Sequence, residues 1–128
     1  MRLKADNIVI VGLAFSTPML EALEANPGRW DLSHVKAMSS SGSMWSQENK
    51  RGLLSHARNA VIMDSFGSSE AVGLGASASA PGAEAATAAF MLGPNCAVFT
   101  EEGQRVRPGS GERGLVAVSG FLPVGYYK

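Results

Sequence analysis

The stretch AVIMDSFGSSEAVGLG (residues 60–75) decides the fold, because its apolar strand is followed at once by polar residues. The apolar run ends at Asp64, and Phe66 and Glu70 follow among serines and glycines. A short apolar run bounded by turn residues, here residues 60–64, is typical of a strand in a parallel sheet. Open sheets of this kind bind ligands beyond the carboxyl ends of their strands. The stretch therefore predicts an α/β fold with a ligand site in this loop.

The N-terminal part of the sequence predicts a strand and a helix. Residues 8–12 (IVIVG) are a continuous β-branched run, which is typical of a strand covered on both faces. Thr17 and Pro18 have the pattern of a helix N-cap and a first helical residue. The Asn-Pro-Gly sequence at 26–28 is a stop signal, so we expect the helix to end there.

A second strand and a second helix follow before the decisive stretch. The strand is predicted over residues 35–39, and Ser46 is the expected N-cap of a helix that reaches Ala57. Leu53, Leu54 and Ala57 share the inward side of that helix. The order is therefore β-α-β-α-β, and right-handed crossovers place all three strands in one parallel sheet.

The C-terminal third has the pattern of antiparallel β-structure. Residues 96–106 predict two strands that meet at a Glu-Gly turn, and residues 115–119 predict another strand after a glycine-rich loop. The alanine-rich residues 76–90 fit either a loop or, in their second part, a helix. The expected organisation is an α/β unit, a connecting segment and a small antiparallel, barrel-like β unit of the same domain, over residues 1–75, 76–95 and 96–128.

Composition excludes several classes of protein. The chain has 128 residues, enough for one domain or a piece of one. Lys+Arg and Asp+Glu are 11 each, so no charge excess points to nucleic acid or to an anionic membrane. No apolar run approaches the roughly 20 residues that span a bilayer, so no transmembrane segment is predicted. A single cysteine, Cys96, excludes an internal disulfide and fits a reducing, cytoplasmic setting.

The loops that leave the predicted strands carry the candidate chemistry. Two of them, residues 39–45 (SSSGSMW) and 64–70 (DSFGSSE), combine hydroxyl groups with glycine, which lets backbone N–H groups approach an anion closely. Glu70 supplies the hard oxygen ligand that Mg²⁺ prefers, and Phe66 offers a flat face to a purine base. This pattern indicates a site for a nucleotide with magnesium.

Simpler interpretations of the same residues remain open. Phe66 can be a core residue, Glu70 a solvated carboxylate and Cys96 a small buried hydrophobe. A Ser-His-Asp arrangement of Ser68, His56 and Asp64 lacks the second glycine of a nucleophile elbow. The loop after residues 8–12 has one glycine and lacks the dinucleotide-binding fingerprint.

Three segments, in order, resemble the adenylate-forming (AMP-binding) superfamily, which includes acyl-CoA synthetases and peptide-synthetase adenylation domains. FGSSEA (66–71) resembles the Tyr-Gly-x-Thr-Glu motif, and SSGSMWS (40–46) resembles the Ser-Gly-Gly-Ala-Pro-Leu-Ser stretch. Residues 101–128 resemble the later run that contains Gly-Glu-x-Gly and closes on Gly-Tyr. Together with IVGLAFSTPMLEAL (10–23), these segments are most similar to fatty-acyl-CoA synthetases, including enzymes that act on steroid side-chain acids.

The resemblance implies a role for each matching residue. Ser69 takes the place of the threonine that contacts the ATP phosphates, and Glu70 that of the Mg²⁺ carboxylate; these two would be the catalytic residues. Phe66 replaces the tyrosine that lies against adenine, and Asp64 and Ser65 stand where acceptors meet the adenine amino group. The residues implied for ATP or AMP binding are Ser41, Gly42, Ser43, Asp64, Ser65, Phe66, Gly67, Ser68 and Ser69. In this set Ser41 replaces a glycine of the family.

The resemblance also implies a reaction. A carboxylic acid, either fatty or from a steroid side chain, attacks ATP to give acyl-AMP and pyrophosphate, and coenzyme A then displaces AMP. The family's upstream phosphate loop, its ribose-binding aspartate and its C-terminal domain have no counterpart in this sequence. We therefore expect these residues to be a fragment of a larger enzyme, inactive alone, that can self-associate through its exposed sheet edges.

Two other functions remain open. The acyl group can pass to a carrier protein, as in an acyl-AMP ligase or an adenylation module. Alternatively, the chain is a non-catalytic α/β module that binds a nucleotide or a protein partner.

Overall fold

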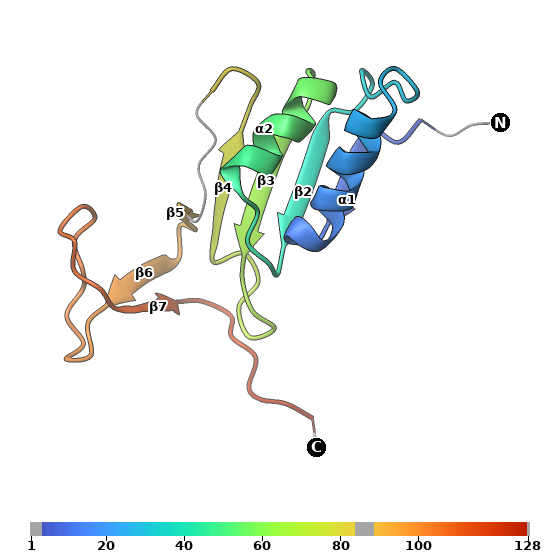
Figure 1. Ribbon diagram of the computed structural model, residues 1–128. Coiled ribbons are helices and arrows are strands. Elements are labelled where there is room, and N and C mark those ends of the chain that lie inside the picture. Colours follow the sequence, from blue (N-terminus) through green and yellow to red (C-terminus); the bar gives the residue numbers. More distant parts are fainter. Residues whose placement is uncertain (1–3, 84–88, 128) are drawn as a thin grey trace.

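The computed structural model describes residues 4–83 and 89–127 and contains an α/β layer followed by a small β unit (Figure 1). Its elements are β1 (Asn7–Ile10), α1 (Gly12–Ala25), β2 (Ala37–Ser41), α2 (Gln47–His56), β3 (Val61–Phe66), β4 (Gly75–Ser79), β5 (Met91–Leu92), β6 (Cys96–Phe99) and β7 (Leu115–Val118). None of the helices that these residues form is long and apolar enough to cross a membrane.

The main sheet has five strands in the order β1-β2-β3-β4-β5. β1, β2 and β3 pair in parallel, which confirms the predicted β-α-β-α-β unit. β4 and β5 extend this sheet by antiparallel pairing. Both come from the segment that we expected to be a connection. The helix considered for its second part falls largely on residues 84–88, outside the described residues.

The small unit is a two-stranded antiparallel sheet of β6 and β7. The predicted turn after β6 is present, because the Thr100 N–H donates to the Gln104 carbonyl at 2.8 Å. The strand expected after that turn is reduced to one bridge between Phe99 and Arg105.

Both helices lie on one face of the main sheet and bury the core there (Figure 1). Ser46 caps α2 as predicted, since its hydroxyl accepts a hydrogen bond from the Asn49 N–H at 3.2 Å. Leu53, Leu54 and Ala57 are buried, as expected for the inward side of α2. The core consists of Ile10, Leu23, Val35, Met38, Trp45, Leu53, Leu54, Ala57, Ala60 and Ile62.

α1 begins earlier than the sequence predicted. The expected N-cap Thr17 and first residue Pro18 both lie inside the helix, which starts at Gly12. Val11 makes no side-chain cap, and instead the Gly12 N–H donates to the Ser40 hydroxyl at 2.8 Å. A hydroxyl of β2 thus accepts a hydrogen bond from one of the unpaired N–H groups at the start of the helix. The sequence around Gly12 gives no sign of this partner, so the helix start could not be predicted from it. The helix ends at Ala25, in agreement with the stop signal.

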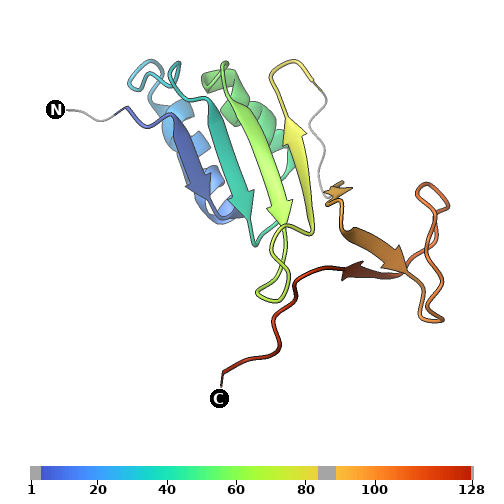
Figure 2. The same ribbon diagram turned by 180° about the vertical axis from the view of Figure 1, so that it is seen from behind.

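Within residues 4–83 and 89–127, nothing covers the opposite face of the sheet, which is called the bare face below (Figure 2). Val9 is 74% exposed and Met63 is 46% exposed, so the expectation that residues 8–12 would be covered on both faces is wrong for this chain. The whole chain exposes 9460 Å². A compact protein of its 13.3 kDa would expose about 6450 Å². Much apolar surface therefore remains in contact with water.

We expect Gly12→Ala to lower the free energy of unfolding by about 3 kcal/mol. Gly12 has a φ of +48°, and a Cβ there would lie 2.6 Å from the Ser43 Cβ. Gly28→Ala is the matched control: its φ is +75°, but nothing lies within 4 Å of an added Cβ. That variant should lose about 1 kcal/mol in urea unfolding. Equal losses in the two variants would contradict close packing at Gly12.

Candidate nucleotide site

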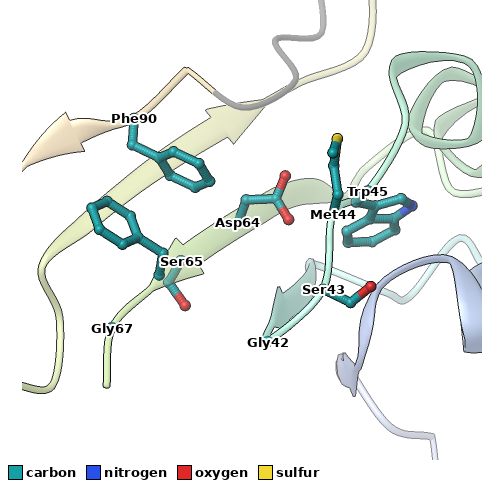
Figure 3. Close-up of a pocket in the computed structure, with 9 residues that line it drawn as sticks. Gly42, Ser43, Met44, Trp45, Asp64, Ser65, Gly67 and Phe90 are labelled. Atoms are coloured by element: carbon teal, nitrogen blue, oxygen red, sulfur yellow. The ribbon is translucent and has the colours of Figure 1, made fainter. Parts of the chain in front are cut away.

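A cavity of about 390 Å³ opens at the carboxyl ends of β2 and β3, on the side of the helices (Figure 3). The parallel register places Ser40 opposite Asp64 and Ser41 opposite Ser65, so the two predicted loops leave the sheet side by side. The lining residues are Gly42, Ser43, Met44, Trp45, Asp64, Ser65, Phe66, Gly67 and Phe90. Most of the residues implied for nucleotide binding are thus brought together.

Two phenylalanines form one wall of the cavity. The rings of Phe66 and Phe90 meet edge to face, with centroids 4.9 Å apart and planes at 62°. Gly75 pairs with Phe66 across β3 and β4, and a Cβ on Gly75 would lie 2.4 Å from Phe66 Cε1. Only glycine leaves room for the ring in this position. Phe66 therefore packs against the fold and lines the cavity at the same time. The sequence did not point to Phe90, which is distant along the chain.

Asp64 supplies the charged group of the cavity. It is 7% exposed and forms an ion pair with Lys50 of α2, which is fully buried. Figure 3 shows the Asp64 side chain directed toward the segment that carries Met44 and Trp45. The sequence predicted Asp64 but not Lys50, because a lysine in an amphipathic helix is normally solvated.

Trp45 forms the wall opposite the phenylalanines and is held in place by α2. Its indole Nε1–H donates to Asn49 Oδ1 at 2.7 Å, and the side chain is 1% exposed. Trp45 lies within the SSSGSMW loop, but its place in the wall becomes visible only with the packing of α2.

The remaining predicted residues lie outside this cavity. Ser69 and Glu70 line a second cavity of about 420 Å³ together with C-terminal residues such as Leu122 and Tyr126. The Tyr126 hydroxyl donates a hydrogen bond to the Glu70 carboxylate. Ser68 closes the turn through its N–H, which donates to the Ala71 carbonyl at 3.0 Å.

Two predicted residues are thus not part of either lining. Ser41 is exposed at the end of β2, and Ser68 closes the turn that contains Glu70. The alternative Ser-His-Asp arrangement is not formed, because Asp64 pairs with Lys50 and the Ser68 hydroxyl bonds to Glu70.

Glu70 is ready to act as an anion. A hydrogen bond from the Ser68 hydroxyl, and then one from its own backbone N–H, hold the pKa of Glu70 below its ordinary value of 4.5. Among residues 4–83 and 89–127 there is no group of three or more His, Cys, Asp or Glu side chains that could hold a metal ion. Mg²⁺ is often bound by one or two carboxylates together with substrate phosphates. A single ionised Glu70 fits that mode of binding and does not make a protein-only metal site.

Curated proteins resemble the chain over almost its whole length. No protein-family model matches the chain. It is 37% identical over 127 residues to a medium/long-chain-fatty-acid–CoA/3-oxocholest-4-en-26-oate–CoA ligase of Mycobacterium marinum. It is 36% identical over 126 residues to the protein of the same name in Mycobacterium tuberculosis. A 3-oxocholest-4-en-26-oate–CoA ligase of Rhodococcus rhodochrous is 36% identical over 133 residues. Each match covers 98% of this chain and 23% of the relative.

Solved structures agree on the fold. The Vibrio cholerae adenylation domain AlmE, determined with glycyl-adenosine-5'-phosphate, superposes with a TM-score of 0.65 at 14% identity. It covers 90% of this chain, which covers 22% of AlmE. VinN superposes with a TM-score of 0.62 at 16% identity, covering 83% of this chain and 27% of VinN. The chain has the fold of part of an adenylation domain. The relatives that it matches are named medium/long-chain-fatty-acid–CoA/3-oxocholest-4-en-26-oate–CoA ligases and 3-oxocholest-4-en-26-oate–CoA ligase.

We expect Ser68→Ala to raise the pKa of Glu70 toward its ordinary value of 4.5, because the largest cause of the shift is the Ser68 hydroxyl. An NMR titration of the carboxyl carbons in the 128-residue chain measures this. Glu102 is the internal control, since the Thr100 hydroxyl lowers its pKa in the same way and is left intact. An unmoved Glu70 would rule out the Ser68 hydroxyl as its donor.

Proposed function

We propose that this chain is the nucleotide-binding part of an acyl-CoA synthetase that activates a carboxylic acid with ATP. The observation that carries the proposal is the match over 98% of the chain to ligases that attach fatty or steroid acids to coenzyme A. The reaction would form acyl-AMP and pyrophosphate, and the thiol of coenzyme A would then displace AMP. Such transfers depend on positioning and on charge stabilisation, which loops rich in N–H and hydroxyl groups provide.

The geometry supports different roles for the two cavities. In the first, Phe66 would lie against adenine, with Asp64 and the 65–67 backbone around the base. Gly42 and Ser43 would border both the nucleotide and the acid. In the second cavity, Ser69 would contact the phosphates.

Glu70 is the residue that would bind Mg²⁺ on the ATP phosphates. When bound, the ion would neutralise charge that develops on the phosphates. Glu70 would hold and orient it through a carboxylate that is exposed and ionised. The carboxylate has about four lone-pair sites, so the hydrogen bonds from Ser68 and Tyr126 leave acceptor capacity for a cation.

Several further features of the whole protein are part of the proposal. The acid would be a fatty acid or a steroid side-chain acid, the acceptor coenzyme A, and the location cytoplasmic. The chain spans about 23% of the length of the curated relatives that it matches. We therefore expect the 128 residues alone to form no acyl-AMP.

The test is ATP–pyrophosphate exchange by the protein from the complete reading frame that contains this chain, against a panel of fatty and steroid side-chain acids. We expect exchange with one acid class and a loss of about 100-fold or more in Glu70→Gln. Glu102→Gln is the matched control, because it removes another exposed loop carboxylate whose pKa is lowered by a neighbouring hydroxyl. It should keep the exchange rate of the unmodified protein.

Other outcomes separate the remaining candidates. Exchange without acyl-CoA formation would favour a carrier protein as the acceptor. No exchange with any acid, together with nucleotide binding, would favour a non-catalytic module. Equal losses in Glu70→Gln and Glu102→Gln would contradict the role of Glu70.

We also propose that the isolated chain self-associates through its exposed sheet edges and the bare face of the sheet, which exposes Val9 and Met63. In sedimentation velocity, Met63→Lys should shift the chain toward monomer. Val72→Lys is the control, because Val72 is 94% exposed but lies in the loop between β3 and β4 and not in a strand. A monomeric unmodified chain at high concentration would refute it.

A further inference from the structure

The buried ion pair between Lys50 and Asp64 is not explained by stability. Lys50 is fully buried in α2, next to the core residues Leu53 and Leu54. Removing two charges from water is costly, and apolar side chains of similar volume usually stabilise a core at least as well. The side chains of both partners are almost entirely shielded from water. A buried pair of this kind is therefore a candidate for a role at the site that it adjoins.

The pair joins the core to the candidate nucleotide cavity. Asp64 lines that cavity from the end of β3, and Lys50 meets its Oδ2 from α2. Lys50 is absent from the cavity lining, and its ion pair with Asp64 connects it to the cavity. A carboxylate has about four acceptor sites, and one ammonium does not use them all. Asp64 therefore keeps acceptor capacity toward the cavity while the ammonium fixes its orientation.

A carboxylate fixed in this way discriminates between purines. It accepts hydrogen bonds and cannot donate them. The exocyclic amino group of adenine is a donor, and a hydrogen bond to a charged acceptor is about twice as strong as a neutral one. Hypoxanthine and guanine carry a carbonyl oxygen at the same position, which would face the carboxylate lone pairs without a proton between them. Sites built around a hydrogen bond strongly reject analogues that lack the matching group.

We propose that Lys50 is a positioning residue that fixes the orientation of the Asp64 side chain, and that this pair selects an adenine over a 6-oxopurine nucleotide. The inference rests on the proposed function only in taking the cavity as the site of the base. Lys50 touches neither the nucleotide nor the acid in this arrangement. Its effect is on nucleotide selectivity and not on the chemical step.

The test compares ATP with ITP, using calorimetric binding and exchange kinetics of the protein from the complete reading frame. Lys50→Met keeps the apolar stem and removes the charge. We expect it to weaken ATP binding at least tenfold and to lower the ATP-to-ITP preference at least tenfold. The KM for the acid should be unchanged. A purely structural role would lower the amount of folded protein and leave the ATP-to-ITP preference as it was.

A second variant covers the case in which Lys50→Met leaves Asp64 buried without its partner and fails to fold. Lys50→Met combined with Asp64→Asn removes both charges, so the urea midpoint should recover relative to Lys50→Met. Its ATP-to-ITP preference should also fall, because an amide can present either its oxygen or its NH₂ group to the base. Lys36→Met is the matched control, since Lys36 pairs with Asp6 at 3.5 Å on the surface, where ion pairs contribute little.

Each outcome decides the inference. A folded variant, single or double, with the selectivity of the unmodified protein overturns it. An unmodified protein that binds ATP and ITP equally, or binds neither, also overturns it. Because binding is measured without the acid, a protein that prefers ATP but shows no exchange would refute the proposed ligase reaction and leave the role of Lys50 standing.

Discussion

The parallel pairing of β2 with β3 is the constraint on which the rest of the structure depends. Its register sets Ser40 opposite Asp64, and each of these residues is tied to a different helix. The Ser40 hydroxyl accepts from the N–H that begins α1, while Asp64 pairs with Lys50 of α2. Because the side-chain period of a strand is two, a slip of either strand by one residue would turn that strand's group to the opposite face of the sheet. The register therefore positions both helices and opens the cavity at the same time.

The first turn of α2 acts as the support of the candidate site. Ser46 caps the helix. Two other residues of this turn, Asn49 and Lys50, each hold a side chain that lines the cavity. Asn49 accepts from the indole of Trp45, and Lys50 holds Asp64. A site on rigid elements is held more closely than a site on loops alone. The flanking loops can be rich in glycine and serine because residues of α2 hold Trp45 and Asp64 in position.

The parts of the fold that could be predicted from the sequence are those with local signals. The β-branched runs indicated the parallel strands, and Ser46 marked the start of α2 because its side chain bonds within three residues. The start of α1 could not be predicted, since its capping hydroxyl on Ser40 is 28 residues away. β4 has the sequence GASAS, which carries no β-branched or aromatic residue, so its place in the sheet depends on its pairing with β3 and β5.

The candidate site shows the same difference between residues with local sequence signals and residues whose partners are distant along the chain. Asp64 and Phe66 follow an apolar strand and could be predicted with their neighbours in the loop. Phe90 could not, because it reaches the cavity from the segment before β5, and Lys50 could not, because it meets Asp64 from α2. Glu70 was predicted as part of one site, but the structure places it in a second cavity beside Tyr126.

The bare face of the sheet has a calorimetric consequence. The heat capacity change of unfolding grows with the apolar area that leaves the interior, and is about 12–15 cal/mol/K per residue for ordinary domains. A chain that already hydrates Val9 and Met63 has less such area to expose. Its unfolding enthalpy per residue would also fall below the usual ~0.7 kcal/mol. The isolated chain would therefore melt over a wide temperature interval, with a flat dependence of stability on temperature.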